Sequence, residues 1–496
     1  MSVDDILTIK LNSNDNVATA FNNIAKGEIT QNIKAENDIP KGHKIALKKI
    51  LKGEKIIKYD QIIGLARNDI NIGEHVHVEN TEFKSTEHDY EFSTSIRLPN
   101  FVPESQRPTF DGFKRPNGQV GTRNYIGILT SVNCSATAAR NIANAFDDNI
   151  LSQYPNVDGV VSFTHGTGCG MADSGDGFEA LQRVLLGYIQ HPNLAGVLLI
   201  GLGCEANQIK FLLDAYNLNE NPFFQTMTIQ EMGGLRKTIE EGIKRIHSML
   251  PEINQLERSP QSVEHLSLAL QCGGSDAWSG ITSNPALGHA ADLLVKNGGT
   301  AVLAETPEIY GAEHLLTRRA INKTVGDKLV DRILWWEDYV SRNKGSLNNN
   351  PSPGNKAGGL TTILEKSLGA AAKGGTTPLN DVLLYAEKAK SKGFLFMDSP
   401  GYDPASVTGQ IATGCNLVSF TTGRGSAFGS KPSPSIKIAT NTEMYEHMKE
   451  DMDVNAGKVV TNNESIETVG SEIFDLLVRV ASCLLYTSPS PRDSDQ

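Results

Sequence analysis

LALQCGGSDAWSGITSNPALGHAADLLV, residues 268–295, is the stretch around which the chain is organised. Its apolar run ends at Cys272, a polar glycine turn covers residues 273–276, and an amphipathic segment begins at Asn284. This order predicts a strand, a turn and a helix. Backbone amides and short polar side chains at the carboxyl end of a strand can hold a polar ligand. We therefore expect a ligand site at this turn.

The same arrangement of strand and polar loop recurs along the chain. Strand-like runs are expected near residues 126–130, 159–163 and 196–201, and the run within 416–429 precedes Arg424. Five cysteines are expected to follow strands: Cys134, Cys169, Cys204, Cys272 and Cys415. A single buried cysteine is most often a small apolar core residue. Five at equivalent strand ends favour one shared pocket in which thiols ligate metal or line a site.

The composition of the 496 residues is that of a soluble globular protein of roughly three domains. The formal net charge of -11 argues against nucleic acid or an anionic membrane as the main partner. No apolar run approaches the ~20 residues of a membrane span, and residues 1–10 lack a signal-peptide pattern, so we expect a cytoplasmic protein. Six cysteines without a CxxC pair exclude a disulfide scaffold, a zinc ribbon and a thioredoxin-like motif.

Residues 1–90 contain short alternating apolar runs separated by glycines, which is typical of a small β-rich domain. Its histidines stand out: His43 opens one run, and His75 and His77 are two residues apart in another. Because side chains two apart on a strand point to the same face, His75 and His77 can reach one ion or one substrate. A lone strand histidine is more often solvated or a satisfied core residue, but three in so short a unit favour a function.

A polar, proline-marked linker is expected at residues 91–108, followed by α/β domains at 109–258 and 259–480. The predicted fold class is therefore α/β, with mostly parallel sheets behind a small β-rich domain. A basic turn precedes the first parallel strand, and its Arg123 can fix a carboxylate. The GTGCG loop at residues 166–170 lacks the G-x-G-x-x-G spacing, which excludes a dinucleotide site.

The last of these domains adds candidates for acid and base chemistry. Four ionisable side chains follow one of its strands: Glu305, Glu308, Glu313 and His314. This density suits proton transfer, although carboxylates also favour helix starts on dipole grounds alone. Residues 341–375 are glycine-rich and polar, which predicts a long loop that is either functional or disordered. Its candidate ligand contacts are Asn355, Lys356, Glu365 and Lys366.

Ten motifs, in order along the chain, carry a family resemblance. They are KGHKIAL, IGEHVHVEN, RPNGQVGTRN, SFTHGTGC, HPNLAGVLLIGLGCEANQ, CGGSDAWSGITSNPALG, ETPEIYGAEHLL, NPSPGNKAGGLTT, EKSLGAAAKGG and TGRGSAFG. With them the chain resembles the sugar-acid dehydratase family that includes altronate dehydratase, galactarate dehydratase and sulfolactate sulfo-lyase. The match covers nearly everything from about residue 7 to about residue 480.

The resemblance implies an amino-terminal domain of the SAF type at residues 1–90, joined to a two-part α/β catalytic region. It also implies a divalent metal, Fe²⁺, for which Mn²⁺ can substitute. The implied reaction removes water from a hexonate or hexarate to give a 2-keto-3-deoxy acid. The expected case is D-altronate giving 2-dehydro-3-deoxy-D-gluconate in hexuronate catabolism. The partner is then a small sugar acid, and the chain is expected to form a homo-oligomer, a dimer.

Removing a proton α to a carboxylate requires a base and stabilisation of the enediolate, which a metal can supply. The candidate catalytic residues are His43, His75, His165, Arg123, Arg424 and Lys356. The candidate metal ligands are His75, His77, Cys169, Cys204 and Cys272. The candidate substrate-binding residues are Asn124, Glu205, Ser275, Asp276 and Asn355. We expect all of them to meet in one cavity around one cation, with the base open between His43, His75 and His165.

Several alternatives remain at this stage. The substrate can be galactarate or another hexarate, and a related sulfo-lyase is disfavoured because SAF and catalytic parts are fused in one chain. A non-catalytic sugar-acid binding protein would keep the pocket without turnover. A hydro-lyase can also use an iron–sulfur cluster on three of the five strand-end cysteines. Residues 481–496 are an atypical tail that resembles read-through, so they and Cys483 receive no role.

Overall fold

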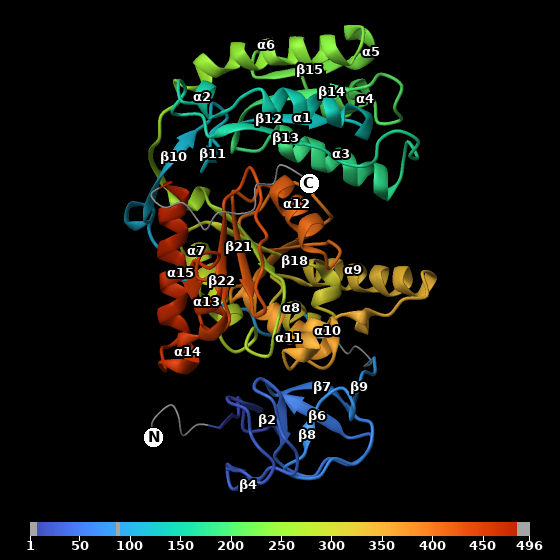
Figure 1. Cartoon of the computed structure of the whole chain (residues 1–496), viewed down its shortest axis with the longest axis vertical. Helices are drawn as coiled ribbons and strands as arrows, with labels where there is room; N and C mark the ends of the chain where they lie inside the picture. Colours follow the sequence, from blue (N-terminus) through green and yellow to red (C-terminus); the bar gives the residue numbers. More distant parts are fainter. Residues whose placement is uncertain (1–6, 86–89, 484–496) are drawn as a thin grey trace.

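The computed structural model describes residues 7–85 and 90–483, which form three domains stacked along the longest axis (Figure 1). We call residues 7–85 the front domain, 109–258 the second domain and 259–483 the third domain. In Figure 1 the third domain lies between the other two. Within the tail predicted at 481–496, positions from 484 onward lie outside the described residues.

The front domain is β-rich, as predicted. Its strands are β1 Thr8–Ile9, β2 Val17–Ala20, β3 Ile29–Thr30, β4 Ile33–Lys34, β5 Lys44–Ala46, β6 Lys55–Lys58, β7 Gln61–Ala66, β8 His75–Val76 and β9 Thr81–Glu82. They form antiparallel sheets with the orders β1-β2-β5-β8, β6-β7-β9 and β3-β4. The register pairs Ile45 with His75. This pairing brings His43, just before β5, beside His75 of β8 and His77 just after it.

The second domain is a parallel sheet of order β13-β12-β14-β15 with helices on both faces. Its strands are β12 Tyr125–Thr130, β13 Gly159–Phe163, β14 Leu194–Gly201 and β15 Phe224–Thr228. Its helices are α1 Ala136–Asn144, α2 Asp148–Leu151, α3 Asp176–Ile189, α4 Ile209–Tyr216, α5 Ile229–Met232 and α6 Leu235–Ile253. Helices α1 and α6 bury their apolar sides against one face, and α3 and α4 pack on the other. The three strands predicted from the sequence are therefore confirmed.

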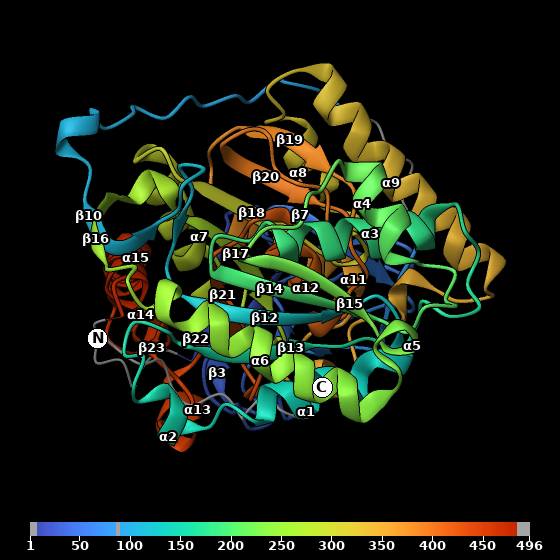
Figure 2. The same cartoon turned by 90° about the horizontal axis from the view of Figure 1, so that it is seen from above.

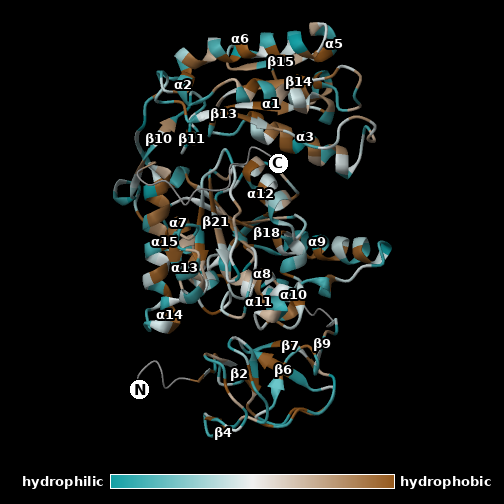
Figure 3. Cartoon of the chain, viewed as in Figure 1, coloured by the Kyte–Doolittle hydropathy of each residue, from teal (hydrophilic) through white to brown (hydrophobic). Residues whose placement is uncertain are grey.

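The third domain is a seven-stranded parallel sheet of order β19-β20-β18-β17-β21-β22-β23. Its strands are β17 Ser267–Cys272, β18 Thr300–Ala304, β19 Leu379–Leu383, β20 Gly393–Met397, β21 Leu417–Thr422, β22 Ser435–Ala439 and β23 Val454–Asn455. Its helices are α7 Ser283–Lys296, α8 Glu313–Thr317, α9 Lys323–Arg342, α10 Pro353–Ala357, α11 Ile363–Ala371, α12 Asp403–Thr413, α13 Thr442–His447, α14 Lys458–Thr461 and α15 Ile466–Ala481. Figure 3 shows apolar residues concentrated inside this domain, as a sheet covered on both faces requires.

The stretch at residues 268–295 forms the predicted strand, turn and helix, with β17 ending at Cys272 and α7 beginning at Ser283. β17 is the central strand, with β18 on one side and β21 on the other. From β17 the chain adds β18 on one side of the sheet, and it later returns to add β21 on the other side. The order in which strands are added therefore reverses between β17 and β21. In open parallel sheets such a switch point, at the carboxyl ends of the strands, is where ligands bind.

The segment that follows the front domain wraps the third domain. Ser93 N and Ser95 N donate to Thr317 O and Arg318 O, and Val102 N donates to Lys296 O. In Figure 2 this segment runs along the outside of the third domain from the side of α9 to β10. The segment expected as a linker therefore also fastens the outside of the third domain.

A small sheet of order β11-β10-β16 links the second and third domains, because β10 (Thr109–Lys114) pairs with β16 (Ser259–Ser262) as well as with β11 (Val120–Gly121). Two predictions about the fold are corrected. The long loop predicted at 341–375 instead contains α10, begun by a Ser352 capping box, and α11, which is buried throughout. Cys415 follows α12 and precedes β21, so it lies at the amino end of the sheet.

In the part of the chain that the structure describes, no helix is both long enough and apolar enough to cross a bilayer.

Candidate functional site

The loops after β17 and β21 are joined at the switch point of the third domain. Gly423 N and Arg424 N both donate to Gly274 O, at 3.1 and 2.9 Å. Asn355 Nδ2, from α10, donates to Ser275 O at 2.8 Å. The GGSD turn is therefore held from two sides, and Arg424 stands at its exposed edge.

Asp276 organises this turn from the inside. Its buried carboxylate accepts hydrogen bonds from Thr440 Oγ1 at 3.0 Å and from Ser279 Oγ at 3.2 Å, and Asn441 Nδ2 donates at 3.1 Å. A Cβ atom on Gly423 would lie 2.2 Å from Asp276 Cγ, so only glycine fits there. Because protein groups already bond both carboxylate oxygens, Asp276 shapes the loop that carries Ser275.

Three histidines of the front domain converge, and we call His43, His75 and His77 the imidazole cluster. His43 Nδ1 lies 2.9 Å from His75 Nε2, and the ring centroids of His43 and His77 are 4.3 Å apart. One ligand nitrogen from each ring lies within 4.8 Å of the others. The prediction that His75 and His77 share a face is confirmed by their stacked rings, 5.5 Å apart.

The imidazole cluster faces the third domain. His43 Nε2 lies 3.3 Å from Ala357 O of α10, and a Cβ on Gly42 would lie 3.2 Å from Gly358 O. Burial, followed by the charges of His43 and Lys44, lowers the pKa of His75 to about 4. Burial, followed by the charge of Lys44, lowers the pKa of His77 to about 3. The rings are therefore neutral at pH 7, and neutral imidazole is the form that ligates metal.

A buried ion triad fastens the front domain to α11. Glu365 Oε2 accepts from Lys44 Nζ at 2.9 Å and Glu365 Oε1 accepts from Lys58 Nζ at 3.0 Å, with all three side chains almost fully buried. Burial acts to raise the pKa of Glu365, but the two ammonium groups outweigh it and hold that pKa well below its usual range. Burial lowers the pKa of Lys44 to about 8. The triad fixes the front domain, and with it the imidazole cluster, on the third domain.

Glu365→Gln is expected to lower the free energy of unfolding by about 3–5 kcal/mol, because it leaves two buried ammonium groups without their counter-charge. Glu443→Gln is the matched control, since Glu443 also pairs with a front-domain lysine, Lys41, but on the surface. Its cost is expected to stay below about 1 kcal/mol. Urea unfolding of both variants measures the difference. Equal, small effects would show that the triad does not hold the domains together.

A second cluster lies deeper in the third domain, at the ends of β17 and β18. We call Cys272, Glu305 and Glu308, whose ligand atoms lie within 4.8 Å of one another, the thiol–carboxylate cluster. Lys373 Nζ lies 2.9 Å from Cys272 Sγ, and Lys366 Nζ donates to Glu308 Oε1 at 2.7 Å. Two lysine ammonium groups thus already compensate this cluster, so it is poorly suited to a further cation.

Glu305 and Glu308 have opposite protonation preferences although they are three residues apart. Burial, followed by the charge of Glu308, raises the pKa of Glu305 well above its usual value, and neither Glu305 oxygen has a hydrogen-bond partner among the described residues. Burial also acts to raise the pKa of Glu308, but Lys366 outweighs it and the pKa is lowered. Asp403 at the start of α12 has its pKa raised to about 6, mainly by burial. Carboxyl groups whose pKa values are pushed apart are the usual acid and base of an active site.

Glu305 also has an unusual backbone. Its φ of 73° lies in the left-handed region, which non-glycine residues rarely adopt. Strain of this kind persists where surrounding structure enforces it, and it clusters at functional sites.

The loop from Cys272 to Trp278 connects the two clusters. A void of about 10 Å³ at its centre is lined by residues of both domains, including Tyr59, Ser275 and Lys366. The buried Ser275 Oγ has no hydrogen-bond partner among the described residues. A void of this size holds one water and no six-carbon acid.

Two of the remaining predicted residues have structural contacts away from these clusters. Arg123 is buried and donates to Thr122 O and Val480 O, and Asn124 Nδ2 donates to Asn156 O. The prediction of a carboxylate-binding turn is wrong in this respect, because the turn packs between domains and satisfies backbone carbonyls. Lys356 lies on α10, beside the imidazole cluster, and Asn355 holds the GGSD turn.

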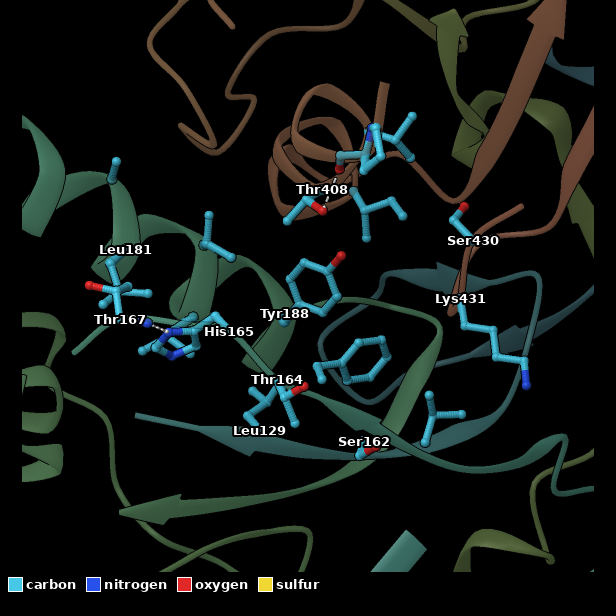
Figure 4. Close-up of a pocket in the computed structure, with 18 of the residues that line it drawn as sticks. Leu129, Ser162, Thr164, His165, Thr167, Leu181, Tyr188, Thr408, Ser430 and Lys431 are labelled. Atoms are coloured by element: carbon cyan, nitrogen blue, oxygen red, sulfur yellow. Dashed lines mark hydrogen bonds between the residues drawn. The ribbon is translucent and has the colours of Figure 1, made fainter. Parts of the chain in front are cut away.

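His165 belongs to the second domain. Its Nε2 lies 2.8 Å from Thr130 O, and its Nδ1 accepts from Thr167 N at 3.3 Å. It lines a pocket of about 480 Å³ between α3 and α12, where Tyr188 of α3 lies next to Thr408 of α12 (Figure 4). Most lining side chains are apolar, which suits a polyhydroxylated acid poorly. His165 is thus separated from the imidazole cluster with which it was grouped.

The five predicted metal ligands fall into three groups, so the expectation of one cavity around one cation is wrong. His75 and His77 lie in the imidazole cluster, and Cys272 lies in the thiol–carboxylate cluster. Cys169 and Cys204 are exposed in the second domain, where Glu205 also lies. The physical reason is that the chain forms two separate parallel sheets, and each gathers its own strand-end loops.

Sequence reasoning missed Lys373 and Asp403. Lys373 is the only charged residue in the run LGAAAKGG, and a lone lysine in an apolar run is a signal for a paired buried charge. Asp403 follows β20 within DSPGYD, a strand-end position like the others that were singled out.

Fold and site define a multidomain α/β protein whose small β domain packs beside buried carboxyl groups with perturbed pKa values at the switch point of a parallel sheet. Family profiles match three consecutive parts of the chain. Residues 6–84 match the altronate/galactarate dehydratase SAF domain, residues 112–254 the D-galactarate dehydratase/altronate hydrolase second domain, and residues 263–490 the D-galactarate/altronate dehydratase C-terminal domain. The chain belongs to the altronate/galactarate dehydratase family, as its motifs indicated.

Three relatives are similar over nearly the whole chain. The altronate dehydratase of Bacillus subtilis is 38% identical over 96% of this chain and 95% of its own length. The altronate dehydratase of Escherichia coli is 36% identical, again over 96% and 95%. The galactarate dehydratase (L-threo-forming) of Escherichia coli is 35% identical over 96% of this chain and 92% of its own.

Proposed function

We propose that this protein is a hydro-lyase that dehydrates D-altronate to 2-dehydro-3-deoxy-D-gluconate in hexuronate catabolism. The observation that carries the proposal is the similarity, over 96% of the chain, to two altronate dehydratases. The chemistry of the site supports it, because elimination of water needs a base, an acid and a stabilised enediolate. Glu305, Glu308 and Asp403 provide carboxyl groups with different proton affinities at one strand edge.

The imidazole cluster fits a divalent ion, for which we propose Fe²⁺ with Mn²⁺ as a substitute. Its three rings are neutral at pH 7, and the buried His77 Nδ1 has no hydrogen-bond partner among the described residues. Imidazole nitrogen suits first-row ions of this kind. When bound, the ion supplies Lewis acidity toward a carboxylate and its neighbouring hydroxyl.

The protein groups then take separate roles in the proposed reaction. Asp403, with a pKa of about 6, is deprotonated at pH 7 and is suited to accept the proton α to the carboxylate. Glu305, whose pKa is raised, keeps its proton and is suited to give it to the departing hydroxyl. Arg424, at the exposed edge of the loop, can hold the substrate carboxylate by a two-point hydrogen bond. Glu308 and Lys366 form an ion pair beside these groups, and their charges help to keep the pKa values of Asp403 and Glu305 apart.

Galactarate is the second candidate substrate, because the galactarate dehydratase is only slightly less similar to the chain than the altronate dehydratases. The test incubates protein supplied with Fe²⁺ under reducing conditions with altronate, galactarate, glucarate, mannonate or sulfolactate, and quantifies 2-keto-3-deoxy acid. We expect the highest kcat/KM with altronate. A higher kcat/KM with galactarate would reassign the substrate, and no product from any of the acids would contradict the proposed function.

We also propose a cytoplasmic location, because the exposed free cysteines suit a reducing compartment. A homodimer is proposed as the oligomeric state. Sedimentation equilibrium tests the dimer, and a single species of about 54 kDa, the mass of one chain, would contradict it.

A further inference from the structure

The proposed function leaves three cysteines of the second domain unexplained. Cys134, Cys169 and Cys204 follow β12, β13 and β14 and are exposed as free thiols. β12 lies between β13 and β14 in the sheet. The chain crosses from β13 over β12 to β14, so the carboxyl ends of these strands form the switch point of this second sheet. All three cysteines therefore occupy the position at which an open parallel sheet holds a ligand.

Backbone contacts hold the three loops together. Asn133 N donates to Thr167 O at 2.9 Å, which joins the Cys134 loop to the Cys169 loop. Ala206 N donates to Cys169 O at 3.0 Å, which joins the Cys169 loop to the Cys204 loop. A Cβ on Gly168 would lie 2.4 Å from Ser131 O, so the first two loops approach as closely as only glycine allows. The cysteines are thus positioned by the fold.

The thiols lie within interaction range of one another. Burial, followed by the neighbouring Cys169, Cys204 and Glu205, raises the pKa of the Cys134 thiol, and Cys134 Sγ donates to Asn133 Oδ1 at 3.6 Å. The three are absent from the groups of described residues whose ligand atoms all lie within 4.8 Å of one another. A single metal ion requires that all its ligand atoms lie close together. A polynuclear cluster binds each thiolate to a different metal atom, so it tolerates larger distances between the cysteine sulfurs.

Glu205 is not available as a fourth ligand. Its Oε1 accepts from Ser131 Oγ at 2.7 Å and its Oε2 accepts from Gly203 N at 2.6 Å, so the carboxylate fixes the turn that presents Cys204. A cluster on these loops would have three protein thiolates and one metal atom open to solvent or to a hydroxyl or carboxylate ligand.

We propose that Cys134, Cys169 and Cys204 bind an iron–sulfur cluster of the [4Fe–4S] type with one iron free of protein ligands. This site is separate from the imidazole cluster and does not depend on the proposed substrate. The three exposed thiols do not contribute to the core of the second domain, because apolar helices cover its sheet. Packing therefore does not explain why the loops bring the three thiols together. A cluster gives all three a common role.

The test reconstitutes the full chain anaerobically with Fe²⁺ and sulfide and measures acid-labile sulfide and visible absorption. We expect about four sulfides per chain, the sulfide content of one [4Fe–4S] cluster, together with broad visible absorption. Sulfide reports this site alone, because an ion on the imidazole cluster brings none. The variant Cys134→Ser/Cys169→Ser/Cys204→Ser should lose sulfide and absorption together, while Cys483→Ser, the matched control thiol, should keep both.

Two results would overturn the proposal. One is wild-type protein without stoichiometric sulfide, including protein that binds one Zn²⁺ or one iron on these cysteines. The other is equal sulfide in the triple variant. Because the three side chains are exposed, the triple variant should keep its thermal midpoint and far-ultraviolet spectrum, so a loss of sulfide would not arise from misfolding. Turnover of altronate is measured separately, so the cluster and the proposed function can fail independently.

Discussion

His43→Ala and His75→Ala are each expected to lower the turnover of altronate by about a hundredfold or more, the usual scale for the loss of a group that acts directly on the reaction. Each variant removes one nitrogen from the imidazole cluster, in which His43 Nδ1 and His75 Nε2 are only 2.9 Å apart. Steady-state kinetics at saturating Mn²⁺ measures the effect. His447→Ala, at an exposed histidine on α13, is the control and should leave turnover unchanged.

A stability readout separates loss of the ion from loss of the fold. Mn²⁺ at about 100 times its Kd should stabilise the wild-type protein by about 2.7 kcal/mol, because the ion binds the folded state. His43→Ala and His75→Ala should lose most of this gain while keeping their thermal midpoints without metal. Near-normal turnover in both variants would remove the front domain from the chemistry.

Glu305→Gln should also lower turnover by about a hundredfold to ten-thousandfold, because the amide fills the same space but cannot give a proton to the departing hydroxyl. The wild-type rate should fall as the pH rises through the raised pKa of Glu305, since only the protonated form is active. In the variant this alkaline decline should disappear. Measuring kcat from pH 6 to pH 10 in both proteins tests the role.

Glu308→Gln is the informative comparison for Glu305→Gln. Glu308 pairs with Lys366 and accepts from Asn350 Nδ2 at 2.7 Å, so its loss leaves a buried ammonium group uncompensated and should cost about 3–5 kcal/mol of stability. Glu305 has no such partner among the described residues, and its variant should unfold within about 1 kcal/mol of wild type. A Glu305→Gln enzyme with a normal rate and an unchanged alkaline limb would exclude Glu305 as the acid.

The fold was largely predictable because its signals are local. The strand that ends at Cys272 is short and mostly apolar and is followed at once by a glycine turn, and this combination favours a buried parallel strand over a helix. The pairing of β10 with β16 was not predictable, since the two strands are far apart in sequence and no local pattern records which strands pair. The long polar segment at 341–375 was assigned as a loop because its composition hid a capping box at Ser352 and a buried helix.

Parts of the site were predictable where the spacing of residues in the sequence alone decides which side chains lie together. His75 and His77 share a face because they are two residues apart on an extended chain. The grouping of cysteines failed because periodicity shows that a cysteine ends a strand but not to which sheet that strand belongs. Cys272 and Cys204 end strands of different sheets. The meeting of Lys373 with Cys272, 101 positions apart in sequence, follows only from the tertiary fold.

The proposed mechanism requires that the divalent ion binds the imidazole cluster and not the thiol–carboxylate cluster. The most direct measurement is an anomalous difference map, at the manganese edge, of crystals grown with Mn²⁺. We expect a peak within ligand distance of His43, His75 and His77. A peak on Cys272, Glu305 and Glu308, with none among the three imidazoles, would contradict it.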